Sequence, residues 1–259
     1  MKICSVVFKN NGKSYDFIDE KNSKINDYVI VNTEKGIQYG KVIKTIEVCE
    51  DNSSLEYKNI VRIATEEDKS NYLSLLKESS VALNKCKNLV KTLELKMNVL
   101  SAEFNFDKTQ LVFLFTSDDR VDFRELAKKL ASIYHTRIEL RQIGARDKAK
   151  EVGGIGVCGQ KICCARFLHK MDAISMNMAK NQNLALNPNK INGVCGRLLC
   201  CLQYEDENYV RLCKGLPIVG DEYVVSNNVG KVVSVDILNR KIKVLVNGNK
   251  EEVTIDEQQ

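Results

Sequence analysis

Short apolar runs separated by turn residues fill the first 63 positions of the chain. Residues 26–48 predict two strands joined by a turn at Lys35-Gly36. Short strands that follow one another closely are typical of small, strongly twisted sheets. We therefore expect an SH3-like or KOW-like β module over residues 1–63.

Short apolar runs separated by turn residues occur again over residues 214–259, where we expect a second β module. Three strands are predicted there, over Val224–Val225, Lys231–Ile237 and Lys241–Val246. Turns are expected at Asn227-Asn228 and Leu238–Arg240. Modules of this size bind RNA or protein, or serve only as packing units, so they do not identify a function.

Residues 66–97 predict a long helix between the two modules. Its apolar positions recur every seven residues in one stripe, Leu76, Leu83, Val90 and Met97, with a second stripe of Ser79, Cys86 and Leu93. Such a seam packs on the protein's own core or on a partner helix, and core packing is the more common case. Cys86 on the seam, and Cys4 and Cys49 in predicted strands, are interpreted as buried apolar residues.

Two strands are expected after the helix, over residues 98–106 and 109–116, with a turn at Asp107-Lys108 between them. Both segments are rich in the apolar and aromatic residues that favour strands. They form the middle of the chain's central part.

A shorter helix and a third strand complete this central part. Asp122 is placed to cap the helix and Glu125 to complete a capping box. Residues 137–144 predict a half-buried strand with an arginine-bearing face. The order helix, strand, strand, helix, strand predicts an α+β domain over residues 64–147.

Composition agrees with a globular protein, since 44% of the 259 residues are apolar and 28% are charged. The chain has no run of about 18 apolar residues, so no membrane-spanning helix is predicted. The first residues turn polar too soon for a secretory signal. We therefore expect a cytoplasmic protein with mostly reduced thiols, in which clustered cysteines indicate metal ligands or redox centres before structural disulfides.

The positive charge is concentrated in one stretch. Residues 120–170 contain twelve Lys or Arg against five Asp or Glu, whereas the whole chain carries +5. A local basic surface suits an anionic partner such as RNA, although a solvated lysine-rich surface explains the same composition. The candidate contact residues for RNA or an acidic partner are Arg137, Arg141, Arg146 and Arg166.

The cysteines form the most specific pattern in the chain. The stretch "GVCGQKICCARF" at 156–167 is followed 37 residues later by "GVCGRLLCCLQY" at 193–204. The repeated positions include six candidate metal ligands: Cys158, Cys163, Cys164, Cys195, Cys200 and Cys201. A duplicated ligand loop, within a cysteine-rich insert over residues 148–213, is the simplest explanation, because free cysteines usually occur singly as buried residues.

Adjacent cysteines point in different directions on a helix or on a strand. One metal site is therefore expected to take one sulfur from each Cys-Cys pair together with Cys158 and Cys195, which leaves two sulfurs for a second site or a partner. Four thiolates suit an iron–sulfur cluster or a zinc ion. For zinc, the Cys-x4-Cys spacing is longer than usual. Redox disulfides are a third possibility. Cys213 and His169 lie outside the repeat and are further candidates, although a packed or solvated histidine is the more common case.

No established catalytic motif competes with this interpretation. The chain has no Gly-x-Gly-x-x-Gly, Gly-x4-Gly-Lys-Ser/Thr, Gly-x-Ser-x-Gly or His-Glu-x-x-His sequence, and only two histidines. We therefore expect a protein that is not an enzyme.

Residues 120–168, which include the first cysteine motif, and residues 192–205, which include the second, resemble the YaaT/RicT family of bacterial stage-zero sporulation proteins. That family carries a Psp-one C-terminal domain. The resemblance extends from residue 1 to about residue 255, and the paired Gly-Val-Cys-Gly-x3-Cys-Cys motifs make it specific.

The resemblance implies properties that the spacing does not. Proteins of this family form a complex with two small helical partners, YmcA and YlbF, and the complex carries 4Fe–4S clusters with ligands from more than one subunit. The complex assists ribonuclease Y in maturing and turning over messenger RNA. Through that role and the phosphorelay it affects sporulation, competence and biofilm formation. The resemblance thus implies a cytoplasmic regulatory subunit that ribonuclease Y can bring to the membrane periphery.

Two other functions agree with the same residues. A zinc-stapled RNA-binding protein would use the terminal β modules as readers. A thiol–disulfide redox protein would use Cys163-Cys164 and Cys200-Cys201 as exchange pairs.

Overall fold

The computed structural model describes residues 2–8, 12–34, 36–47, 57–169, 171–225, 228–246 and 248–255. The chain divides into two compact units, residues 1–154 with 165–169, and residues 155–164 with 170–259. The protein is a mixed α+β structure, as the sequence predicts, with three sheets in the described ranges. No helix in these ranges is both long and apolar enough to cross a membrane.

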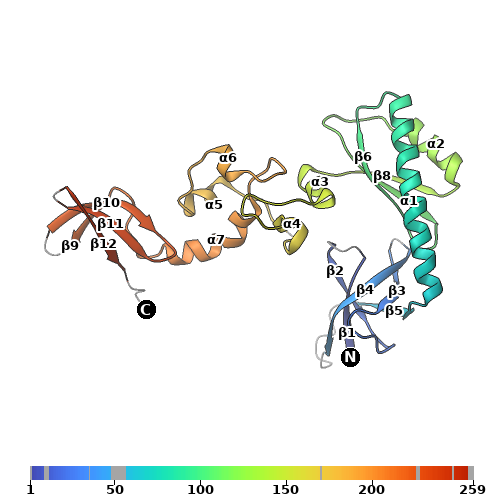
Figure 1. Cartoon of the computed structure of the whole chain (residues 1–259), viewed down its shortest axis with the longest axis horizontal. Helices are drawn as coiled ribbons and strands as arrows, with labels where there is room; N and C mark the ends of the chain where they lie inside the picture. Colours follow the sequence, from blue (N-terminus) through green and yellow to red (C-terminus); the bar gives the residue numbers. More distant parts are fainter. Residues whose placement is uncertain are drawn as a thin grey trace. The chain divides into compact units, whose positions relative to one another are not determined.

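Five strands close into a barrel at the start of the first unit, in the order β1-β2-β5-β3-β4 (Figure 1). They are β1 (Lys2–Val7), β2 (Ser14–Ile18), β3 (Tyr28–Thr33), β4 (Gly36–Glu47) and β5 (Lys58–Ile63). The predicted hairpin is confirmed as the antiparallel pair β3–β4, although Lys35 of its turn lies outside the described residues. Cys4 is fully buried in the barrel core, as expected. Cys49 lies outside the described residues.

A helix-and-sheet layer follows the barrel in the predicted order. It consists of α1 (Glu66–Thr92), β6 (Asn98–Phe104), β7 (Gln110–Thr116), α2 (Arg124–Tyr134) and β8 (Arg137–Gln142). Strand β7 is central, antiparallel to β6 and parallel to β8. Alternate β7 residues, Leu111, Phe113 and Phe115, are buried in one core with residues of α1 and α2, which lie against the sheet in Figure 1.

The buried face of α1 differs from the predicted seam. The helix buries Leu75, Ser79, Ala82, Cys86 and Val90, whereas Leu76 is 48% exposed. The buried positions recur at intervals of three and four residues, which is the 3.6-residue period of a straight helix, whereas a strict seven-residue repeat drifts about 20° per heptad. The core therefore faces Leu75 and not Leu76. The helix also ends at Thr92 and not at residue 97, because Glu94 takes a φ of 50°. The core-packing interpretation and the burial of Cys86 are confirmed.

The predicted capping box at α2 is wrong. The N-cap residue is Phe123, without a side-chain cap bond. The Asp122 carboxylate accepts instead from the backbone N–H of Arg124 at 3.1 Å and pairs with that residue's guanidinium group. Glu125 pairs with Lys129 at 2.9 Å. A capping box is present instead at α1, between Thr65 and Asp68. The Asp68 carboxylate also accepts a hydrogen bond from Arg62 (Nη2 to Oδ1, 2.8 Å).

Helix α3 (Ala145–Val152) follows the central layer. Four helices belong to the cysteine-rich part: α4 (Cys163–Arg166), α5 (Met176–Asn181), α6 (Pro188–Ile191) and α7 (Cys200–Leu212). The second unit ends in a sheet of order β12-β11-β10-β9. Its strands are β9 (Glu222–Val225), β10 (Asn228–Asp236), β11 (Lys241–Val246) and β12 (Asn249–Thr254).

The last strand, β12, is absent from the sequence prediction because its residues are mostly exposed and polar. The predicted turn at Leu238–Arg240 is present, whereas Asn227 of the other turn lies outside the described residues. From this turn Arg240 donates to the carbonyl oxygen of Leu212 at the end of α7 (2.8 Å) and to that of Ile255 (3.0 Å). Arg240 thereby joins the last sheet to the helix that carries the second cysteine pair.

Candidate metal centre

The two cysteine motifs fold into the same small hairpin. An isolated antiparallel bridge joins Ile155 to Lys161, and another joins Asn192 to Leu198. The paired residues of the two bridges are 37 positions apart, like the cysteines. The repeat seen in the sequence is therefore also a repeat of structure.

Backbone hydrogen bonds close each hairpin in the same way. In the first, the Gly156 N–H donates to the carbonyl oxygen of Gln160 at 2.8 Å, and the Gly159 N–H donates to that of Gly156 at 3.0 Å. The matching distances in the second hairpin are 2.8 and 2.9 Å. Gly159 has a φ of 75° and Gly196 a φ of 74°, conformations that favour glycine. The glycine after the first cysteine of each motif is therefore required by the turn.

The first cysteine of each motif folds back over its own hairpin. A Cβ built on Gly156 would lie 3.6 Å from the Sγ of Cys158, and one built on Gly193 would lie 3.9 Å from the Sγ of Cys195. Cys158 is exposed and Cys195 is half-buried. The two sulfurs thus occupy equivalent places in the two hairpins.

Each Cys-Cys pair begins a helix, α4 at Cys163 and α7 at Cys200. The two members of each pair differ in burial, as expected for neighbours on a helix. Cys164 is buried and Cys163 is half-buried, whereas in the second motif Cys200 is half-buried and Cys201 is exposed. The two repeats therefore share a backbone but not the burial of each sulfur.

Thiols from both repeats lie within electrostatic reach of one another. Partial desolvation raises the pKa of Cys201, and the charges of Cys163 and then Cys158 raise it further. The mutual repulsion of these thiolates would be relieved by a bound cation. Cys158 and Cys163 of one motif are thus near Cys201 of the other, in keeping with a ligand set shared between the motifs.

Among the described residues, no three His, Cys, Asp or Glu side chains are already arranged as a metal site. The donor chemistry nevertheless fits a thiophilic metal or cluster, since all six motif cysteines are thiols in the structure. The assignment of the six as ligands stays a prediction.

The two candidates outside the repeat have other surroundings. The Cys213 thiol donates a long hydrogen bond of 3.8 Å to the carbonyl oxygen of Asn181, and burial raises its pKa. Within the described part of the chain, His169 Nδ1 is buried without a hydrogen-bond partner. Neither observation places these side chains with the six motif cysteines.

A small apolar cluster supports the second hairpin, and the sequence prediction does not include it. Leu202 of α7 is buried with Ala179 of α5 and Ile191 of α6. Gln182 Nε2 donates to the carbonyl oxygen of Leu202 at 2.7 Å. Two short helices thereby hold the start of α7, and with it the second cysteine pair.

The four candidate arginines do not form one uniform basic surface. Arg137 and Arg141 lie on the exposed face of β8, as predicted. The Arg141 guanidinium is paired with Glu139, whose carboxylate also accepts from Gln110 Nε2 at 2.6 Å. Arg146 is half-buried and Arg166 is exposed. Part of the predicted positive charge is therefore neutralised locally.

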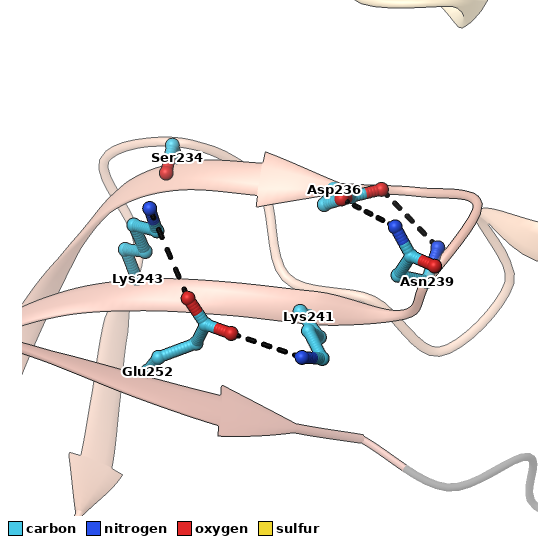
Figure 2. A pocket seen from close by; sticks show the side chains of 6 residues that line it. All are labelled: Ser234, Asp236, Asn239, Lys241, Lys243 and Glu252. Carbon is cyan, nitrogen blue, oxygen red and sulfur yellow. Dashed lines mark hydrogen bonds and ion pairs between the residues drawn. The ribbon is translucent and has the colours of Figure 1, made fainter.

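A polar hollow of about 270 Å³ lies on the last sheet (Figure 2). Its charged groups are satisfied by one another, because Glu252 pairs with Lys241 at 3.1 Å and with Lys243 at 3.8 Å. Asp236 accepts from the side chain of Asn239 at 2.8 Å. The hollow offers little unpaired charge to a ligand.

Two family models match the chain and define its class. The model described as the PSP1 C-terminal conserved region matches residues 58–143, which include β5 and the helix-and-sheet layer. The model described as the PSP1-like protein, third domain, matches residues 173–216, which include the second cysteine motif and α7. Both describe PSP1-like proteins.

The relatives identify the branch of that class. The chain is 44% identical over 252 residues to the protein named Stage 0 sporulation protein YaaT of Bacillus subtilis (strain 168), covering 96% of this chain and 91% of the relative. The chain belongs to the PSP1 family that includes YaaT. An uncharacterized Schizosaccharomyces pombe protein is 27% identical over 164 residues, 51% of this chain and 22% of that protein. Protein PSP1 of Saccharomyces cerevisiae is 45% identical over 47 residues, 18% of this chain and 6% of that protein. No solved structure matches the chain.

Proposed function

We propose that this chain is a non-catalytic regulatory subunit that binds an iron–sulfur cluster, expected to be of the 4Fe–4S type. The proposed ligands are drawn from the six motif cysteines, Cys158, Cys163, Cys164, Cys195, Cys200 and Cys201. One observation supports this most directly: two equivalent hairpins place Cys158 and Cys163 within electrostatic reach of Cys201.

The proposed cluster would replace thiolate repulsion by thiolate–iron bonds and so tie the two hairpins together. The hairpin turns hold Cys158 and Cys195 in equivalent places. The apolar cluster around Leu202 packs the start of α7 against α5 and α6. Four thiolates satisfy one cluster, so two of the six remain for a second site or for a ligand set shared with a partner.

The proposed partners are YmcA-like and YlbF-like small helical proteins, and the proposed role of the complex is to assist ribonuclease Y in messenger RNA maturation and turnover. Membership of the YaaT family and the paired motifs support this role. Sporulation, competence and biofilm formation would be affected through it. In this proposal the two terminal β modules, of SH3-like or KOW-like type, serve as contact surfaces around the cluster-binding insert.

The test is the metal and sulfide content of the chain purified without oxygen, alone and co-expressed with the two partners. Matched iron and acid-labile sulfide with a brown visible spectrum are the expected result. Cys158→Ser and Cys201→Ser should lose most of the iron. Cys213→Ser is the matched control, because it removes a thiol of the same unit outside the repeat, and it should keep the iron.

Other contents would contradict the proposal in distinguishable ways. Colourless protein with bound zinc would favour a zinc-stapled RNA-binding protein. Protein that lacks metal even with its partners, and that turns over a disulfide substrate, would favour a thiol–disulfide redox protein. Equal iron loss in Cys213→Ser would show that the six motif cysteines are not a distinct ligand set.

A further inference from the structure

Two side-chain amides join the end of α5 to the first turns of α7. Gln182 Nε2 donates to the carbonyl oxygen of Leu202 at 2.7 Å, and Asn181 Nδ2 donates to Asp206 Oδ1 at 2.9 Å. Leu202 directly follows the second cysteine pair, which begins α7. The Gln182 side chain therefore holds the helical turn that carries this cysteine pair.

Burial and a third backbone bond add to this support of the second hairpin. Ile191, at the end of α6, is 3% exposed and Leu202 is 1% exposed, in one apolar cluster with Ala179. The Leu199 N–H donates to the carbonyl oxygen of Ile191 at 2.9 Å, in addition to the two bonds that close the hairpin. Contacts with α5, α6 and α7 thus hold both ends of the second hairpin.

The first hairpin lacks these anchors, although its turn is the same. Thirty-seven positions earlier, Gly154 stands in the place of Ile191 and Ala165 in that of Leu202. A Cβ built on Gly154 meets no atom of the described residues within 4 Å, so a side chain there would have no packing neighbour. The backbone bonds found in the described ranges include none from Ile162 to Gly154, which would be the counterpart of the third bond.

Burial within the first hairpin does not supply the same support. Ile162 and Cys164 are buried, but the apolar cluster on α5, α6 and α7 includes neither of them. The helix that begins at the first cysteine pair, α4, has four residues, whereas α7 has thirteen. A helix of one turn has little stability of its own, because nucleating it fixes several residues for one hydrogen bond. The two copies of the motif therefore differ in support and not in turn geometry.

We propose that the second hairpin is the preorganised half of the cysteine site and that Gln182 is its positioning residue. This inference rests on the proposed metal-binding function of the six motif cysteines. Cys195 and one sulfur of the second pair, whose places are already set, would be the first thiolates to ligate. The first hairpin would then bring Cys158 and Cys163 to them, at the entropic cost of ordering its backbone. Removing a group that orients ligands in this way typically lowers metal affinity about 10–100-fold.

The test titrates the full-length chain, reduced and metal-free, with Co²⁺ in the absence of oxygen and follows the thiolate-to-cobalt charge-transfer absorption. Gln182→Met keeps the length of the side chain without its donor, and it should bind Co²⁺ more weakly by about tenfold or more. Gln182→Lys restores a donor of similar reach and should bind nearly as tightly as the natural chain. The matched control, Asn208→Ala, removes an exposed amide of α7 and should not change the affinity. A purely structural role of Gln182 would lower the melting temperature of Gln182→Met and leave its Co²⁺ affinity unchanged.

Equivalent cysteines of the two copies give a second comparison, which does not depend on Gln182→Met being folded. Cys195→Ser should weaken Co²⁺ binding about 5–30 times more than Cys158→Ser does, since fixing the backbone of even one residue costs a factor of this size. Equal losses in these two variants, or equal binding by Gln182→Met and the natural chain, would overturn the inference and leave metal binding by the cysteines intact. A natural chain without charge-transfer absorption would overturn the proposed function itself, and the inference with it.

Discussion

The turn of the second cysteine hairpin allows a quantitative test of why the motif contains two glycines. Gly196 has a φ of 74°, and a Cβ built on it meets no atom within 4 Å. Replacement by alanine would therefore add backbone strain without a steric clash. Gly193, three residues earlier, lies outside the left-handed region, and its Cβ would be in ordinary contact with neighbours at 3.7 Å.

The expected magnitudes follow from these two environments. An L-residue in the left-handed conformation costs about 1–2 kcal/mol. Both substitutions also stiffen the unfolded chain, which stabilises the folded state by about 0.4–1 kcal/mol. That second contribution cancels when the two variants are compared. We expect Gly196→Ala to be less stable than Gly193→Ala by about 1–2 kcal/mol.

Hydrogen exchange followed by mass spectrometry measures this difference locally, in reduced and metal-free protein. The Leu199 N–H, which donates to the carbonyl oxygen of Ile191 at 2.9 Å, reports on the hairpin. Its exchange should be about 5–30 times faster in Gly196→Ala than in Gly193→Ala. Asparagine tolerates the left-handed conformation better than alanine does, so Gly196→Asn should fall between the two.

Equal exchange in the two alanine variants would refute the reasoning, because the strain at Gly196 would then be absent. Faster exchange in Gly193→Ala would show that contact with its neighbours, and not backbone conformation, limits substitution. In either case the second glycine of each motif would need another explanation.

Three further predictions concern the rest of the first unit and its thiols. Gly40→Ala should lower the unfolding free energy of the barrel by about 1–3 kcal/mol, measured by urea unfolding, because the new Cβ would lie 2.4 Å from Val6 Cγ1. Unchanged stability would mean that the strands move apart at no cost. The arginine partner holds the pKa of Asp68 well below its usual value of 3.8, so its stabilising contribution is complete above about pH 5 and is lost as the pH falls toward the folded pKa. The difference in unfolding free energy between the natural chain and Asp68→Asn should therefore shrink from pH 7 to pH 3, and a growing difference would contradict the assignment. Burial raises the pKa of Cys86 to about 11, so this thiol should resist a disulfide reagent in folded, metal-free protein while the exposed Cys158 reacts; equal rates would contradict the burial of Cys86.

Local patterns in the sequence were sufficient for most elements of the first unit. The order α1, β6, β7, α2, β8 and the hairpin β3–β4 follow from runs of residues that are neighbours in the chain. Periodicity and turn residues act over a few positions, so they need no knowledge of distant segments. The 37-residue repeat is of the same kind: it predicts a duplicated loop, and the structure has two equivalent hairpins at these positions.

Predictions failed where a competing contact decided the outcome. Asp122 is a suitable cap by sequence, but Arg124 occupies its carboxylate. The heptad pattern selected Leu76, whereas the straight helix turns Leu75 to the core. Strand β12 pairs with the free edge of β11. Its own residues are mostly polar and exposed, so they have no apolar alternation that would predict a strand.

The sequence by itself determined that six cysteines occur as two copies of one motif, because repetition is visible without coordinates. Only the tertiary structure decided that Cys201 of one copy lies near Cys158 and Cys163 of the other. It also decided that Arg141, prominent in the sequence, is neutralised by Glu139. Charge and ligand distances depend on which segments meet in space, and these meetings depend on packing between residues far apart in the chain.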